Sequence, residues 1–92
     1  MKIRAKLLLY KGGRETPFQN GYRPLFDFDS TSLVSGRIML SSEKKMVYPG
    51  EETEVEIEFI SDDYFGNKLH VGEKILFTES KKPLGEIEII EI

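Results

Sequence analysis

The chain has 92 residues, 39% hydrophobic and 32% charged, with 13 basic and 16 acidic side chains and no cysteine. This length predicts one small domain over residues 1–92, and the lack of cysteine excludes disulfides, thiolate metal sites and a cysteine nucleophile. The net charge of −3 does not favour broad nucleic-acid affinity. No apolar run has the length of a signal peptide or a membrane span, so we expect a cytoplasmic protein with no membrane contact.

Apolar and polar residues alternate with a period of two along most of the chain, and helical periodicity is almost absent. In chain order, this alternation predicts strands over residues 2–7, 24–28, 35–40, 54–59, 74–79 and 85–92. The last strand is also apolar at Ile90 and Ile92, which predicts that both faces of its end are covered. Turn formers separate the strands, and Pro49-Gly50 predicts a tight turn with positive φ at the glycine. The pattern predicts an all-β fold, a small antiparallel barrel or a sandwich.

The charges are distributed unevenly. Residues 1–46 hold nine Lys or Arg and four acids, whereas residues 47–92 hold four Lys and twelve acids. The first predicted strand carries a row of basic side chains and the fourth a row of glutamates, so pairing of these strands would place opposite charges side by side. The alternative is a basic face presented to an anionic partner.

Few residues favour catalysis or metal binding. The only histidine, His70, lies in a loop, and nothing in the sequence associates it with a nucleophile. Asp62-Asp63 lacks the spaced ligands of a calcium loop, and one histidine cannot build a zinc site. Gly12-Gly13-Arg14 lacks the lysine and the helix of a phosphate-binding loop. We therefore expect a non-catalytic protein without cofactor, metal or GTP.

The segment over residues 12–26 is the most informative. It is a glycine-rich loop in which Arg14 and Arg23 accompany Tyr22, and it places Pro24 at the start of a strand. Guanidinium groups stack on aromatic rings, bridge loops or bind phosphate, so the loop either braces the fold or contacts a partner. Replacing Arg14 by Ala separates the two: a contact residue leaves the free energy of unfolding within about 0.5 kcal/mol, whereas a bracing residue does not.

Several motifs in this chain occur in one order. They are Gly12-Gly13-Arg14-x-Thr16-Pro17-Phe18, Gly21-Tyr22-Arg23-Pro24, Val34-Ser35-Gly36-x-Ile38, Met46-Val47-x-Pro49-Gly50, Phe77-x-Glu79 and Leu84-Gly85. Together they resemble the C-terminal (third) domain of elongation factor Tu over residues 3–90. The resemblance implies a six-stranded antiparallel β-barrel, here standing alone without the GTPase domain and the second barrel.

The resemblance also implies contacts that the domain makes in the full factor: with the T stem of aminoacyl-tRNA, the GTPase domain and the exchange factor. Arg14 and Glu79 match family residues, and Ser35 keeps the hydroxyl of a family threonine. Other positions depart from the family pattern: Glu15 replaces a histidine, Leu25 a glutamine, Ser80 and Lys81 two glycines, and Lys82 an arginine.

Because such changes remove or reverse charges that would neutralise phosphates, we expect a non-catalytic interaction module whose partner is a protein of the translation or factor-related machinery. The contact regions expected are the loop over residues 12–23 and the turn over residues 80–83. The alternative is a module that binds a tRNA-like stem or other RNA weakly. The contact residues predicted for a partner or RNA are Arg14, Tyr22, Arg23, Ser35, Glu79, Lys81 and Lys82.

Overall fold

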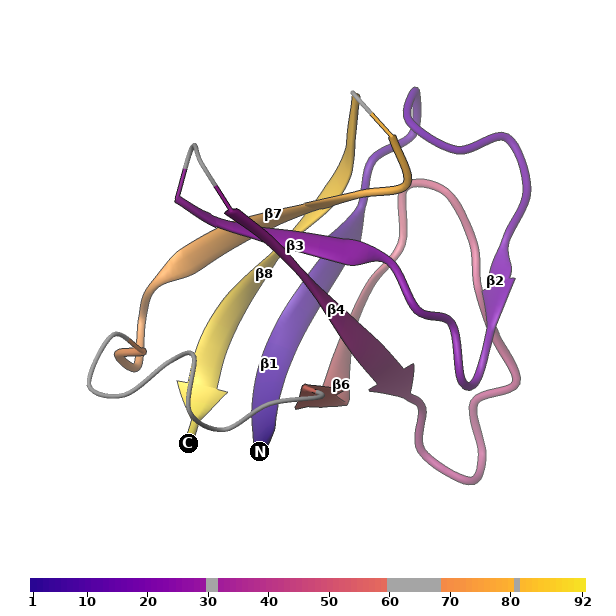
Figure 1. Ribbon diagram of the computed structural model, residues 1–92. Helices are drawn as coiled ribbons and strands as arrows, with labels where there is room; N and C mark the ends of the chain where they lie inside the picture. Colours follow the sequence, from indigo (N-terminus) through magenta and orange to yellow (C-terminus); the bar gives the residue numbers. More distant parts are fainter. Residues whose placement is uncertain (30–31, 60–68, 81) are drawn as a thin grey trace.

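The computed structural model describes residues 1–29, 32–59, 69–80 and 82–92, and this part of the chain contains strands but no helix (Figure 1). The strands are β1 (Lys2–Leu9), β2 (Phe18–Gln19), β3 (Leu25–Asp29), β4 (Ser32–Met39), β5 (Met46–Val47), β6 (Glu52–Phe59), β7 (Lys74–Thr78) and β8 (Pro83–Glu91). The six strands expected from alternation are β1, β3, β4, β6, β7 and β8, and that prediction is confirmed.

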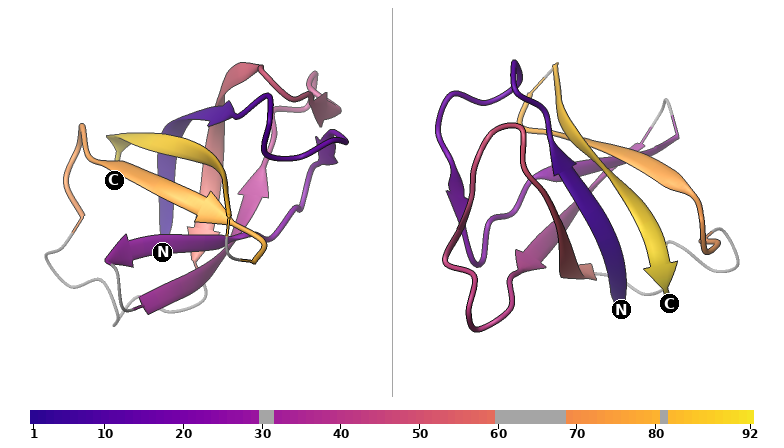
Figure 2. Two further views of the ribbon diagram at one scale, coloured as in Figure 1. Left: turned by 90° about the horizontal axis from the view of Figure 1, so that it is seen from above. Right: turned by 180° about the vertical axis from the view of Figure 1, so that it is seen from behind.

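These six strands close into an antiparallel barrel in the order β1-β6-β4-β3-β7-β8, with β8 pairing back to β1. The fold is therefore the barrel and not the sandwich. The two short strands β2 and β5 pair only with each other, and they lie to one side of the barrel wall (Figure 2). Both chain ends lie at the same end of the barrel, close together.

The core follows from the alternation. Inward-facing residues of every barrel strand are buried, and three phenylalanine rings, Phe26, Phe59 and Phe77, pack in sequence with Phe26 in the middle. Two glycines leave room for these rings: a Cβ on Gly36 would lie 2.8 Å from Phe26 and Phe59, and one on Gly85 would lie 2.5 Å from Phe77. Close packing of the rings against the barrel wall therefore requires glycine at both positions.

The outward side chains of β1 and β6 form the charge ladder, defined here as Lys2, Arg4, Lys6, Glu54, Glu56 and Glu58. Lys2 lies opposite Glu58, Arg4 opposite Glu56, and Lys6 opposite Glu54, so the expected pairing of the two rows is confirmed. Ion pairs run diagonally across the ladder and to its margins, from Arg4 to Glu54 and from Lys6 to Glu52 at 3.9 Å. About half of each of these side chains is exposed, so each pair contributes only a few tenths of a kcal/mol.

Two local expectations had different outcomes. The turn at Pro49-Gly50 is confirmed: the Glu51 amide donates to the Tyr48 carbonyl at 2.9 Å, and φ of Gly50 is 88°. Covered side chains at the end of β8 were wrongly expected, because Ile90 and Ile92 are 38% and 54% exposed. The pairing of β7 with β8 ends at Glu88, so the last residues of β8 extend beyond the neighbouring strand.

Candidate functional site

Arg14 lies at the centre of contacts that join the loop after β1 to the hairpin between β7 and β8. Its guanidinium donates to Glu79 Oε1, and its Nε donates to the Thr16 carbonyl at 2.9 Å. Its Nη2 donates to the Pro17 carbonyl at 3.5 Å. Because the guanidinium directs donors along several fixed directions, one side chain sets both the course of the loop and its attachment to the hairpin.

Tyr22 completes the Arg14 cluster, defined here as Arg14, Phe18, Tyr22 and Glu79. The Tyr22 ring lies 4.8 Å from Arg14 Cζ and stacks on Phe18 with ring centroids 4.6 Å apart. Its hydroxyl donates to the same Glu79 oxygen that Arg14 contacts. Burial and the hydrogen bond to Glu79 raise the pKa of Tyr22 above its usual value of 10.0, so the phenol remains a neutral donor at pH 7.

Lys82 attaches the hairpin turn to the same loop. Its Nζ donates to the Gly12 carbonyl at 3.0 Å, and its own carbonyl accepts from the Thr78 hydroxyl at 2.6 Å. Gly13 comes so close to β8 that a Cβ there would lie 2.9 Å from the Leu84 backbone. The loop after β1 therefore contacts the β7–β8 hairpin through a hydrogen bond at Lys82 and through close backbone packing at Leu84. Lys81 lies outside the described residues.

Four predicted contact residues, Arg14, Tyr22, Glu79 and Lys82, are thus brought to one end of the barrel and engage one another or the adjoining loop backbone. Arg14 is only 24% exposed, whereas the side chain of Glu79 is 47% exposed. These contacts favour the bracing interpretation for Arg14, and a partner contact by this cluster stays a prediction.

The other two described predicted residues, Arg23 and Ser35, lie apart from that cluster. The Ile38 amide donates to the Tyr22 carbonyl at 2.8 Å, and the Gly36 amide donates to the Pro24 carbonyl at 3.3 Å. These bonds continue the register that sets Leu25 opposite Ser35, so Arg23 lies opposite Arg37.

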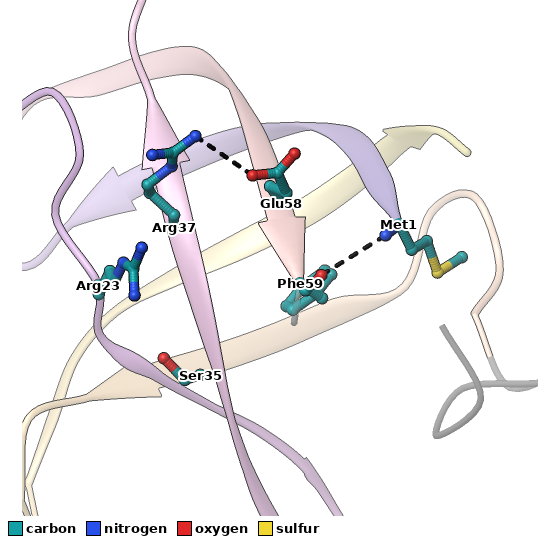
Figure 3. Close-up of a pocket in the computed structure, with 6 residues that line it drawn as sticks. All are labelled: Met1, Arg23, Ser35, Arg37, Glu58 and Phe59. Atoms are coloured by element: carbon teal, nitrogen blue, oxygen red, sulfur yellow. Dashed lines mark hydrogen bonds and ion pairs between the residues drawn. The ribbon is translucent and has the colours of Figure 1, made fainter. Parts of the chain in front are cut away.

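Arg23, Ser35 and Arg37 line the arginine hollow, a depression of about 310 Å³ whose other lining residues are Met1, Glu58 and Phe59 (Figure 3). In Figure 3 the Arg23 side chain lies between those of Ser35 and Arg37. The Arg37 Nη2 donates to Glu58 Oε1 at 3.2 Å. The hollow therefore combines two guanidinium groups with a hydroxyl, a chemistry suited to oxyanions.

Beyond the hollow, the outer surface of β3, β4 and β7 becomes apolar. We define the leucine face as Leu25, Leu33 and Leu76 together with Asp27. Leu33 and Leu76 both lie opposite Asp27, on either side of β3, and they are 49% and 41% exposed. Leu25 and Asp27 are half-buried and point outward, because Phe26 between them is fully buried.

Sequence analysis did not identify Leu33, Arg37 or Leu76 as functional candidates. The alternation does carry the signal for Leu76, which lies between the buried Ile75 and Phe77 and must therefore face solvent. The alternation does not predict that β3 pairs with both β4 and β7. This pairing brings the three leucines around the Asp27 carboxylate.

The side chains relevant to catalysis and metal binding are His70 and the acidic residues. His70 is exposed, and its backbone amide donates to Glu73 Oε1 at 3.2 Å. In the described ranges, no three His, Cys, Asp or Glu side chains are grouped so as to hold a metal ion. Asp62 and Asp63 lie outside those ranges. The part of the chain that the structure describes also has no helix long and apolar enough to cross a membrane.

A comparison with known protein families shows which family the chain belongs to. A family model described as the elongation factor Tu C-terminal domain matches residues 2–65. The chain belongs to this family. The match spans β1 to β6, and β7 and β8 then complete the closed barrel that the family resemblance implied. Membership makes this elongation factor Tu C-terminal-domain protein a translation-related β-barrel module, and the family's domain is a non-catalytic one.

Proposed function

We propose that this chain is a non-catalytic binding module whose partner is a protein of the translation machinery, and that the partner docks on the leucine face. The module works without GTP, metal or cofactor, and it acts in the cytoplasm, where translation factors operate. The observation that carries the proposal is the pair of exposed leucines, Leu33 and Leu76, on either side of Asp27.

Apolar side chains grouped on a surface are typical of protein interfaces, whereas RNA interfaces need many cations. The leucine face contains one carboxylate and, among its described members, no cation. An apolar partner surface that also presents a basic side chain would bury the leucines and pair with Asp27. This charge complementarity defines the chemistry of the partner at this part of the barrel.

Two of the cations expected to meet RNA, Arg14 and Lys82, have other contacts. Arg14 donates to Glu79 and to two loop carbonyls, and Lys82 donates to Gly12. On the outer face, Leu25 occupies the position of a family glutamine. These features support a protein partner over an RNA stem.

A weak RNA-binding module is the second candidate, and a specific observation favours it: Arg23 and Arg37 face each other beside the Ser35 hydroxyl. Few phosphates could be neutralised there, so RNA binding would show a log–log salt dependence of only a few units.

The test is capture from host lysate by the immobilised domain, with and without ribonuclease. A Leu33→Glu/Leu76→Glu variant places two negative charges on the leucine face. Its matched control, Lys2→Gln/Lys6→Gln, lowers the net charge by the same amount on the charge ladder. We expect a ribonuclease-resistant protein that the wild type and the control retain and the leucine variant loses. Capture of RNA, with proteins lost after ribonuclease, would replace this proposal by the second candidate.

A further inference from the structure

The strand register places two arginines opposite each other. On the charge ladder, every basic side chain lies opposite a glutamate. At the arginine hollow, Arg23 instead lies opposite Arg37 on the same outer surface. Like charges directly across an antiparallel pair destabilise a sheet, so this juxtaposition indicates a site whose charge is completed from outside.

The acids around the hollow neutralise only part of this charge. Glu58 accepts from Arg37 at 3.2 Å, and Arg37 and Glu58 are 42% and 41% exposed. Arg23 is exposed and forms no ion pair with another residue in the described part of the chain. Two guanidinium groups and the Met1 ammonium outnumber the one carboxylate, so the hollow is net positive and suits an anion.

Arg37 also has a donor without an acceptor. Its Nε is buried and makes no hydrogen bond within the described residues. A buried, unpaired donor costs about 1–3 kcal/mol, and a small movement of the guanidinium toward an anion in the hollow would relieve that cost. The volume of about 310 Å³ is sufficient for a carboxylate, and Ser35 supplies a hydroxyl donor beside it.

We propose that the arginine hollow binds the carboxylate of an acidic side chain on the protein partner, through Arg23, Arg37 and the Ser35 hydroxyl. This inference rests on the proposed function, and it adds an acidic anchor next to an apolar contact. Ser35 lies directly opposite Leu25, so the hollow and the leucine face are continuous along β3 and β4. The partner segment is therefore both acidic and apolar where it crosses Arg23.

A carboxylate fits better than an RNA phosphate backbone. A guanidinium pairs with either group in a bidentate manner, so the local geometry alone does not choose between them. The surroundings do: an RNA stem presents several phosphates to a protein surface, whereas the hollow has the Glu58 carboxylate at one margin and the apolar leucine face at the other.

The experiment is an NMR titration of the ¹⁵N-labelled chain at low salt, and it does not require the natural partner. The probes are a capped Leu-Glu-Leu peptide, its Leu-Gln-Leu counterpart and a short RNA duplex. We expect the glutamate peptide to shift the amide resonances of Arg23, Ser35 and Arg37, and the glutamine peptide to bind at least tenfold more weakly. Arg37→Gln and Arg23→Gln should each weaken glutamate-peptide binding about tenfold.

Arg4→Gln removes the same charge from the ladder and should leave peptide binding unchanged. Arg23 has no ion pair with another described residue, so Arg23→Gln remains informative even if Arg37→Gln perturbs the fold. Equal binding of the two peptides, insensitivity to both arginine variants, or RNA shifting these resonances at lower concentrations than the peptide would each overturn the carboxylate site. Capture through Leu33 and Leu76 is measured separately, so loss of the hollow would leave the proposed function standing.

Discussion

Two outer surfaces of one barrel follow the same two-residue alternation and differ in what they leave unsatisfied. On the charge ladder, basic side chains of β1 lie opposite glutamates of β6 and form exposed ion pairs with neighbouring acids. On the surface of β3, β4 and β7, one arginine lies opposite another and two leucines flank an aspartate. The first surface compensates its own charges, whereas the second leaves an arginine pair and exposed leucines that we propose a partner covers.

This contrast also explains the uneven charge of the chain. The basic N-terminal and acidic C-terminal halves interleave at β1 and β6, so their opposite rows largely compensate each other. Charge asymmetry along the sequence therefore reports strand pairing here, and it gives little information on a partner. A partner is better sought on the surface of β3, β4 and β7, where Arg23 lies opposite another cation.

The largest expected loss of stability comes from truncating the buried side chains beneath the two surfaces. Phe26 lies under the leucine face and Ile57 under the charge ladder, and both are fully buried. Either residue changed to Ala should lower the free energy of unfolding by roughly 3 kcal/mol or more, because each leaves a cavity. Urea denaturation measures this. If one of the two variants lost less than about 1 kcal/mol of the free energy of unfolding, the residue changed would not be a core residue, which would contradict the single core beneath both surfaces.

The next effect concerns the Arg14 cluster, which joins the loop after β1 to the hairpin between β7 and β8. Arg14→Ala should cost about 1–2 kcal/mol, because a mostly buried guanidinium loses its contacts with Glu79 and the loop carbonyls. Glu79→Ala should cost less, and the double variant should be less destabilised than the sum of the two. A change within 0.5 kcal/mol for Arg14→Ala would contradict the bracing role and favour a partner contact.

Tyr22 gives the same cluster a pH signature. Its raised pKa means that the unfolded chain ionises first, so its stabilising contribution is present below pH 10.0 and declines as the pH rises through the folded-state pKa. Tyr22→Phe should therefore be less stable than the wild type at pH 7, by about 1 kcal/mol, and the difference should narrow above pH 10. Unfolding curves at pH 7, 9 and 11 test this. A constant difference would contradict the hydrogen bond to Glu79.

The smallest stability effects distinguish the two surfaces most clearly. Arg4→Gln on the ladder should cost a few tenths of a kcal/mol, with the cost shrinking as salt screens the exposed pairs. Leu33→Glu/Leu76→Glu should lower the free energy of unfolding by no more than about 1 kcal/mol per site, because both leucines are exposed and the only cost is repulsion between each new carboxylate and Asp27 opposite it. Thermal unfolding at low and high salt measures both. A large loss for the leucine variant would make the leucine face structural.

The sequence predicted the barrel well because its strands obey one physical rule. Alternation located the six barrel strands, and the charge rows predicted the pairing of β1 with β6. The sequence alone did not locate the candidate surfaces, because these depend on which strands become neighbours in the barrel. Arg14 and Glu79 are distant in sequence and meet only once the hairpin of β7 and β8 folds against the loop. Arg23 and Arg37 likewise become opposite each other only through the hydrogen bonds that the Tyr22 and Pro24 carbonyls accept from β4.

The most direct measurement of the central claim places a photo-crosslinking amino acid at Leu33 or, on the charge ladder, at Glu54, and irradiates the host cells expressing each variant. Both side chains lie on the outside of the barrel, about half exposed. We predict a ribonuclease-resistant protein adduct at position 33 and none at position 54. An adduct at position 54 alone, or an RNA adduct at position 33, would contradict the assignment of the leucine face as a protein-docking surface.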